Sequence, residues 1–231
     1  MKINHLSLLE GAREARGLTV VIDVFRAFSL ECYLFDAGVE KIYAVGAQET
    51  ARALKAEHPE YVLAGERGGI MLPGFDYGNS PYQVRDAQLR GRTAVHTTSA
   101  GTQGLVNASH ADEIITGSLV NSRAIAEYIR EKNPAEVSLV AMGLKGKRLA
   151  AEDELCARYI RSILEENELD MQAELEKLRT DETSQRFFDP GTQDVFPQED
   201  YWMCTDVDKF GFVLRVERTG EDVFEVTRHN I

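Results

Sequence analysis

One stretch decides the fold class: Val20-Val21-Ile22-Asp23-Val24-Phe25-Arg26, an apolar β-branched run that ends at two charged residues. Such a run predicts a strand buried on both faces, as in a parallel sheet. Residues 29–37 then carry apolar side chains at helical spacing and stop at Gly38. Charges at a strand-to-helix junction lie where open α/β sheets bind ligands. Taken alone, this junction is equally compatible with a surface aspartate and arginine in a turn.

Three further segments repeat this form, with polar residues directly after a short strand. They are residues 61–69, residues 93–102, and residues 137–143 followed by Glu152-Asp153-Glu154. Between them, predicted strands alternate with predicted helices at 48–58 and 121–132. This alternation predicts an α/β fold of three layers, α/β/α, with a mainly parallel sheet. Because polar residues recur at four such junctions, we expect the edge of the sheet where these junctions lie to be functional.

The chain is expected to form a single unit over residues 1–231. A weak internal similarity relates residues 18–60 to residues 92–133, and it predicts two similar lobes around a shared cleft. Residues 165–187 are charged and helix-prone, which predicts a solvated helical excursion that offers a contact surface for a homo-oligomer. Residues 210–228 alternate about a turn and predict a C-terminal hairpin.

Composition restricts the class of protein. A formal net charge of −12 argues against a nucleic-acid-binding protein, which needs a basic surface to displace counterions. No apolar run is long enough to cross a membrane, and the first residues lack the apolar core of a signal peptide. The three cysteines form neither a disulfide framework nor a CxxC metal site. A cytoplasmic location is therefore expected.

Helix phase identifies two acids that face the interior. Glu152 and Asp153 lie four residues before Cys156 and Ala157, which belong to the apolar face of the same predicted helix. The side chains of both acids are therefore expected to point into the protein. An alternative explanation is that acids in the first turn of a helix interact favourably with the helix dipole. Cys156 shares this buried phase and is expected to be a structural thiol.

Two arginines and one hydroxyl-rich turn suit an anionic ligand. Arg26 and Arg67 each follow a strand, where a guanidinium can hold phosphate or carboxylate through two parallel hydrogen bonds. The turn at residues 97–102 offers hydroxyl and backbone N–H groups, but it lacks the GxxxxGK[ST] spacing of a nucleotide-binding loop. Hydroxyl residues are also common in ordinary turns, so this turn alone is weak support.

Acids at the predicted sheet edge suit a divalent cation. Several carboxylates close to arginines are the donor set for Mg²⁺ that holds a phosphorylated substrate. The candidate ligands are Asp23, Glu66, Asp76, Glu152 and Asp153. Zinc is a poorer candidate, because the five histidines show no ligand spacing.

Six motifs, in order along the chain, resemble the 2-phosphosulfolactate phosphatase family over about residues 18–165. They are Asp23-Val24-Phe25-Arg26-Ala27, Gly65-Glu66-Arg67, Gly74-Phe75-Asp76-Tyr77-Gly78-Asn79-Ser80-Pro81, Thr97-Thr98-Ser99-Ala100-Gly101-Thr102, Gly117-Ser118 with Asn121, and Glu152-Asp153-Glu154-Leu155-Cys156-Ala157. The resemblance implies a Mg²⁺-dependent phosphatase acting on a small phosphorylated acid of the coenzyme M or sulfolactate pathway. It also implies an α/β/α architecture with a cleft between similar lobes.

The resemblance, together with the residue types, implies roles for some of the motif residues. The catalytic group comprises Asp23, Arg26, Arg67 and Asp153, with either water or Asp23 as the nucleophile. The substrate-binding group comprises Asn79, Ser80, Thr97, Thr98, Ser99, Gly101 and Thr102.

Three departures from the motifs bear on specificity. Phe28, Leu30 and Ala100 stand where the family tends to have polar residues. We expect this loss of donors to weaken the binding of a sulfonate substrate. The alternative function is a catalytically idle relative that binds a small anionic metabolite.

Overall fold

Strand β2 (Gly17–Ile22) lies inside a ten-stranded sheet in the computed structural model, which describes all residues from 1 to 231. Val20 and Ile22 pack into a cluster on one face of the sheet, and Val21 packs into a different cluster on the other. All three side chains are fully buried, so the apolar run is covered on both faces, as its composition predicts.

The sheet consists of two parallel blocks joined by a hairpin, with the strand order β1-β8-β2-β7-β9-β10-β3-β6-β4-β5. The first block contains β1 (Lys2–Ser7), β8 (Glu136–Ala141), β2 and β7 (Ala111–Gly117). The second contains β3 (Lys41–Val45), β6 (Thr93–Thr97) and β4 (Val62–Arg67), with the short β5 (Ile70–Met71) antiparallel at its edge. The hairpin of β9 (Phe212–Arg218) and β10 (Val223–Asn230) pairs antiparallel with β7 and β3. The predicted α/β class with a mainly parallel sheet is confirmed.

The twist of the sheet brings the carboxyl ends of both blocks toward one space. Three antiparallel pairings separate β7 from β3, so the second block runs opposite to the first in the hydrogen-bonded order. A twist of about 25° for each of the five steps from β2 to β6 accumulates to roughly 125°, which offsets much of that reversal. As a result, residues that follow β2, β6 and β8 line one cavity together with the end of β4.

Helices cover both faces of the sheet and complete three layers. On one face, α1 (Leu8–Glu14), α2 (Ala27–Asp36), α4 (Pro81–Val84) and α5 (Gly101–Asn107) supply buried residues to a cluster shared by both blocks. On the other, α6 (Ser122–Lys132) and α7 (Ala151–Leu164) pack against the first block, with the 3₁₀ turn η1 (Leu119–Asn121) before them. Helix α3 (Gln48–Glu57) packs against the second block through Ala51.

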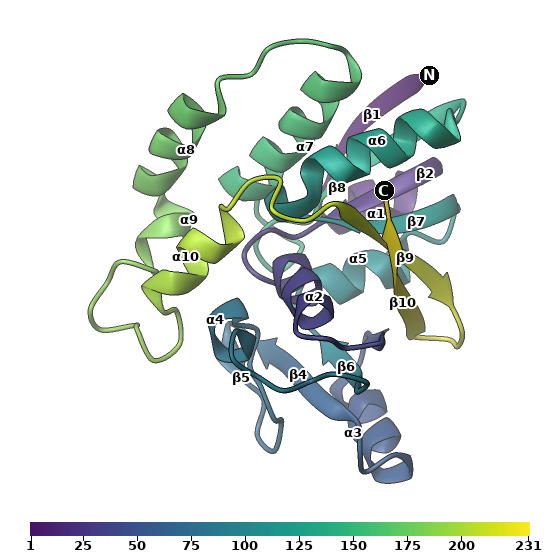
Figure 1. Cartoon of the computed structure of the whole chain (residues 1–231). Coiled ribbons are helices and arrows are strands. Elements are labelled where there is room, and N and C mark those ends of the chain that lie inside the picture. Colours follow the sequence, from purple (N-terminus) through teal and green to yellow (C-terminus); the bar gives the residue numbers. More distant parts are fainter.

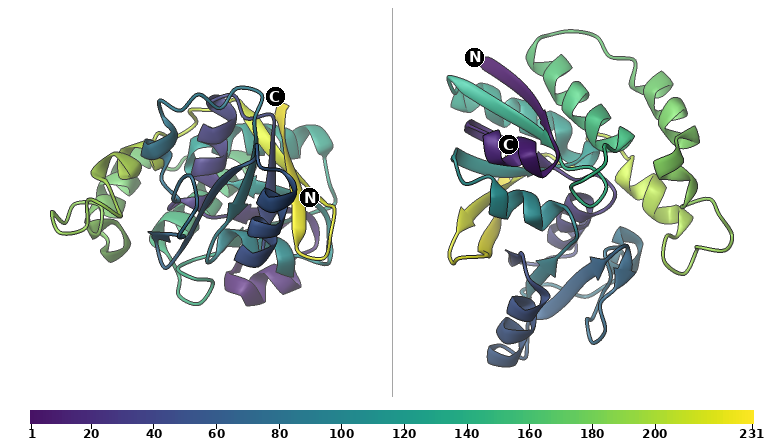
Figure 2. Two further views of the ribbon diagram at one scale, coloured as in Figure 1. Left: turned by 90° about the horizontal axis from the view of Figure 1, so that it is seen from below. Right: turned by 180° about the vertical axis from the view of Figure 1, so that it is seen from behind.

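Residues 165–211 form a helical segment beside one end of the sheet (Figures 1 and 2). It contains α8 (Met171–Thr180), α9 (Glu182–Gln185) and α10 (Gln198–Cys204). The buried side chains of Leu178, Phe187 and Tyr201 attach it to the rest of the molecule. None of the helices combines the length and the apolar character that a membrane span requires.

Gly104 sets how closely α5 approaches the sheet, and its replacement by alanine should destabilise the fold. A Cβ atom at this position would lie 2.5 Å from Met142 Sδ and 2.6 Å from Val21 Cγ1. Gly104→Ala is expected to lower the free energy of unfolding by about 1–3 kcal/mol, measured by urea denaturation. Gly211→Ala is the matched control, because a Cβ there would meet nothing within 4 Å. Equal stability of the two variants would contradict this packing.

Candidate active site

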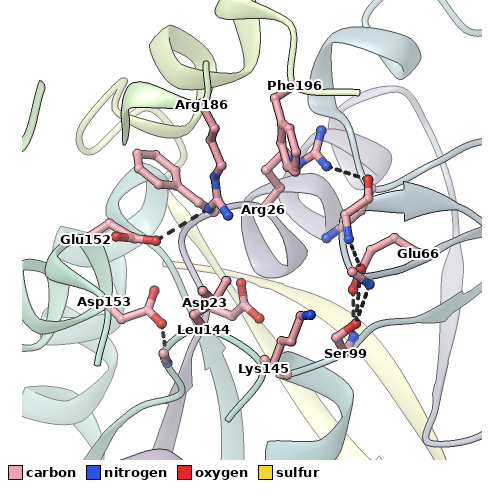
Figure 3. A pocket seen from close by; sticks show the side chains of 16 residues that line it. Asp23, Arg26, Glu66, Ser99, Leu144, Lys145, Glu152, Asp153, Arg186 and Phe196 are labelled. Carbon is pink, nitrogen blue, oxygen red and sulfur yellow. Dashed lines mark hydrogen bonds and ion pairs between the residues drawn. The ribbon is translucent and has the colours of Figure 1, made fainter. Parts of the chain in front are cut away.

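The strand ends enclose one small cavity roofed by the helical segment. Its floor comes from residues after β2 and β8, and Arg186 and Phe196 reach into it from the segment above (Figure 3). The cavity holds about 70 Å³, room for roughly five water molecules or one small ligand.

Half of the residues predicted as catalytic, substrate-binding or metal-binding line this cavity. Those that do are Asp23, Arg26, Glu66, Asn79, Ser99, Glu152 and Asp153. Those that do not are Arg67, Asp76, Ser80, Thr97, Thr98, Gly101 and Thr102.

Two of the cavity carboxylates already hold the loops around them. Asp153 accepts hydrogen bonds from the backbone N–H groups of Val24 at 2.7 Å and Gly143 at 2.8 Å, and so ties α7 to the ends of β2 and β8. Glu66 accepts from the backbone N–H groups of Gly69 and Ser99, both at 2.6 Å. Both acids therefore position these loops, while lone pairs that accept no hydrogen bond remain on their oxygens.

Asp23 and Glu152 each keep one oxygen free. Asp23 Oδ1 accepts a hydrogen bond of 3.3 Å from Ala27 N–H, and no protein group bonds Oδ2. Glu152 Oε2 accepts from the Thr183 hydroxyl at 2.8 Å, and Oε1 has only the Arg186 guanidinium, 4.0 Å away. Gly101 leaves room beside Asp23, since a Cβ there would lie 3.1 Å from Oδ2.

Burial makes the carboxylates at the centre of the cavity reluctant to ionise. It raises the pKa of Asp23 to about 7, and the neighbouring Glu66 and Glu152 carboxylates add repulsion. Burial also raises the pKa of Asp153, where Asp23 and Glu152 repel a further charge, and the pKa of Glu152. A cation placed among these groups would lower their pKa values and favour the ionised carboxylates.

Arg26 is held by protein acceptors. Its Nη1 donates to Val195 O and to Asp200 Oδ2, both at 2.8 Å, and its Nη2 donates to Gly69 O at 3.1 Å. The guanidinium also stacks on the Phe196 ring, 4.7 Å from its centroid. Arg26 thus fastens the helical segment over the end of β2.

Arg186 has a cationic group with no hydrogen bond to the protein. Its guanidinium lies between the rings of Phe187 and Phe196, and its buried Nε has no partner. Burial lowers its pKa, which the nearby Glu152 partly opposes. Lys145, on the loop after β8, is another cavity cation, and its ammonium makes neither an ion pair nor a hydrogen bond. Neither residue is predicted from the sequence; Arg186 lies in a charged segment that resembles a solvated helix.

The predicted residues outside the cavity have structural partners. Arg67 donates to Glu66 O at 2.6 Å and to Thr97 Oγ1 at 2.9 Å. Asp76 accepts from Leu63 N–H at 2.8 Å and pairs with Lys55 at 3.5 Å.

The hydroxyl-rich turn is closed on itself. Thr98 and Thr102 exchange hydrogen bonds between each hydroxyl and the other residue's backbone N–H, at 3.1 and 3.2 Å. Ser80 donates to Asp200 at 2.8 Å. Of the turn residues predicted to bind substrate, only Ser99 lines the cavity, and its hydroxyl donates to Glu66 Oε2 at 3.1 Å.

The expected effect of Phe28 and Leu30 on specificity lacks a structural basis. Both side chains are fully buried in the cluster beneath α2, and neither lines the cavity. They fill space between the helix and the sheet, so they remove no donor from the ligand. Ala100 does line the cavity, and it is the one departure that faces the site.

No three histidine, cysteine, aspartate or glutamate side chains form a ready-made metal cluster. The donor set nevertheless fits Mg²⁺, which is commonly bound through one or two carboxylates, with substrate phosphate and water as the other ligands. Asp23 Oδ2 and Glu152 Oε1, which accept no hydrogen bond, are the candidate donors. Of the predicted ligands that line the cavity, Asp23 and Glu152 are the two that keep an oxygen without a hydrogen bond.

Comparison with known proteins gives consistent matches. The sequence model of the family described as 2-phosphosulpholactate phosphatase matches residues 5–219. A probable 2-phosphosulfolactate phosphatase from Bacillus subtilis (strain 168) is 30% identical over 207 residues, covering 88% of this chain and 89% of the relative. A protein of the same name from Carboxydothermus hydrogenoformans is 39% identical over 167 residues, covering 72% and 68%.

The buried Asp23 should make stability depend on pH when divalent cations are absent. Its pKa of about 7 exceeds its ordinary value of 3.8, so its contribution is fully present below about pH 4 and is lost as pH rises through 7. The difference corresponds to roughly 4 kcal/mol. In EDTA, Asp23→Asn is expected to unfold at a higher temperature than wild type above pH 7, with the gain fading toward pH 4. The exposed Asp76→Asn is the control, and an Asp23→Asn gain that does not change with pH would contradict the assignment.

Proposed function

Because the chain belongs to the 2-phosphosulpholactate phosphatase family, we propose that it is a Mg²⁺-dependent phosphatase that hydrolyses a small phosphorylated acid in this cavity. The names of the relatives support 2-phosphosulfolactate as the first substrate to test. One observation carries the proposal. The cavity holds a guanidinium without hydrogen bonds, that of Arg186, 4.0 Å from Glu152 Oε1 and in the same space as the open oxygen of Asp23.

In this proposal, each open group has a defined task. Asp23 and Glu152 would hold the Mg²⁺ ion, which supplies a Lewis acid for the phosphoryl oxygens when bound. Arg186 would donate two parallel hydrogen bonds to the phosphoryl group and stabilise its charge as the bond to the leaving oxygen breaks. Lys145 would attract the second acidic group of the substrate.

The closed surroundings suit this chemistry. Phe196 covers one side of the cavity and lies against Gly69, where a Cβ atom would come within 2.4 Å of the ring. Asp153 and Glu66 fix the loops that carry the open groups. Charge interactions are stronger among buried groups than in bulk water, so few donors suffice.

The idle-binder alternative has less support. A protein that only binds an anion has no use for two open carboxylate oxygens, because they repel the ligand unless a cation accompanies it. Asp23 and Glu152 both keep such an oxygen. We therefore retain hydrolysis as the proposed activity.

Arg186 provides the sharpest test of the phosphate site. Arg186→Gln is expected to reduce kcat/KM for 2-phosphosulfolactate about 100-fold, because a donor to the transition state is lost. Arg186→Lys keeps the charge without the two-pronged geometry and is expected to lose about tenfold. Arg161→Gln, on the exposed side of α7, is the control. Activity of Arg186→Gln within twofold of wild type would place the phosphate elsewhere.

Removal of divalent cations should abolish turnover, and Mg²⁺ should restore it. Glu152→Gln is expected to raise the Mg²⁺ concentration for half-maximal rate by at least about tenfold, because one of two carboxylate ligands is lost. Glu154→Gln is the matched control two residues away, since Glu154 bonds His5 and Ser7 outside the cavity. Full turnover after exhaustive chelation would contradict the proposed cofactor.

A further inference from the structure

A buried chain of three polar side chains leads from helix α2 to the cavity. Glu31 Oε1, on α2, lies 2.9 Å from His96 Nδ1, on β6. The other ring nitrogen, His96 Nε2, lies 3.2 Å from Asn79 Oδ1. Glu31 and His96 are completely buried, and Asn79 is 6% exposed, at the wall of the cavity.

The oxygens at both ring nitrogens define where the protons lie. A carbonyl oxygen such as Asn79 Oδ1 can only accept, so His96 Nε2 carries a proton. The contact between Nδ1 and Glu31 Oε1 holds a second proton. Together the two side chains form a pair without net charge, which is the form that a buried site tolerates.

Asn79 is thereby fixed in one orientation. Its carbonyl oxygen is occupied by His96, so the amide Nδ2 is the end left for the cavity, and no protein acceptor bonds it. A rotation of the amide by 180° would place Nδ2 against Nε2, which accepts only when it carries no proton, and the buried Glu31–His96 pair would then have a net negative charge. The histidine therefore determines that Asn79 presents a donor, and not an acceptor, to a ligand.

We propose that Glu31 and His96 are positioning residues that hold the Asn79 amide as an N–H donor to an anionic oxygen of the bound phosphate ester. This inference rests on the proposed function, because it needs an anion in the cavity. Asn79 touches the ligand, whereas Glu31 and His96 act through it.

Packing alone explains this arrangement poorly. The pair lies in the cluster shared by both sheet blocks, among apolar side chains such as Ala44 and Ala64. Glu31 Oε2 is buried there without a hydrogen-bond partner, which costs stability. Apolar residues of similar volume would fill the same space at a lower cost. The polar chain instead fixes the orientation of the Asn79 side-chain amide.

Variants of Asn79 test the donor directly. Asn79→Asp keeps the shape and the acceptor for His96 but presents a carboxylate oxygen to the cavity, and Asn79→Leu presents no polar group. With Mg²⁺ present, the Kd for inorganic phosphate by isothermal titration calorimetry is expected to rise about tenfold in Asn79→Leu and more in Asn79→Asp. Wild-type affinity in both variants overturns the inference while leaving the proposed function intact. Failure of wild type to bind phosphate and to hydrolyse phosphate esters overturns both.

Two variants of His96 separate positioning from packing. The amide nitrogen of glutamine can replace Nε2, and that of asparagine can replace Nδ1. His96→Gln therefore keeps a donor for Asn79, and His96→Asn keeps only the contact with Glu31. Phosphate affinity and KM are expected to stay near wild type in His96→Gln and to worsen about tenfold in His96→Asn, at similar unfolding midpoints. Equal losses in both variants overturn the inference.

The wild-type protein offers a measurement that does not depend on a folded variant. Long-range ¹H–¹⁵N correlation spectra report which nitrogen of His96 carries a proton. A protonated Nε2 is expected in the free protein. A proton-free Nε2 overturns the inference, because Asn79 would then turn its carbonyl oxygen toward the ligand.

Discussion

The buried ion pair between Arg26 and Asp200 is the interaction on which the site depends. It joins the end of β2 to α10 across 2.8 Å, and both side chains are almost inaccessible to solvent. Asp200 also accepts hydrogen bonds from Ser80 Oγ and Tyr82 N–H, so three distant parts of the chain meet at one carboxylate. Removal of one partner of such a pair commonly costs about 3–5 kcal/mol, because a buried charge is left alone. The pair therefore keeps the helical segment, with Arg186 and Phe196, above the acids of the strand ends.

The hydrogen bonds that a charged side chain already makes determine what it can do for a ligand. Arg26 and Arg67 follow strands, as anion-binding arginines often do, yet each already donates three hydrogen bonds to oxygens of the protein. Arg186 lies in the charged helical segment, where the sequence does not indicate a ligand site, yet its guanidinium donates no hydrogen bond to the protein. The acids divide in the same way: Asp153 binds two backbone N–H groups, whereas Asp23 keeps one oxygen open. The cavity thus has a framework of satisfied charges and a smaller set of open ones.

This division shows how far the sequence could predict the site. Local patterns locate the strand ends, and since these ends meet in space, Asp23, Glu66 and Asp153 could be placed together from strand and helix phase alone. Hydrogen-bond occupancy depends on partners far along the chain, such as Asp200 for Arg26, and no local pattern contains it. Phe28 shows that a difference within a motif does not always change the site. The expected change in the ligand pocket does not occur there, because the side chain faces the core. Local patterns also predict the fold class. They do not predict that the C-terminal hairpin lies between the two parallel blocks, because alternation of strands and helices along the chain does not specify which strands are neighbours in the sheet.

The balance of charge around the cavity connects the proposed cation with the phosphate. Four carboxyl groups and three cationic side chains line it, and burial already raises the pKa of three of those carboxyls. A phosphate dianion that entered alone would add two negative charges to surroundings that disfavour further negative charge. A divalent cation held by Asp23 and Glu152 would reverse the sign of the local field and would also favour the ionised carboxylates. Each ligand would then increase the affinity for the other by the same factor, as linkage requires. Under this proposal the open acids and the open guanidinium would form one binding unit, in which the cation would allow the acids to remain beside the phosphate that Arg186 would attract.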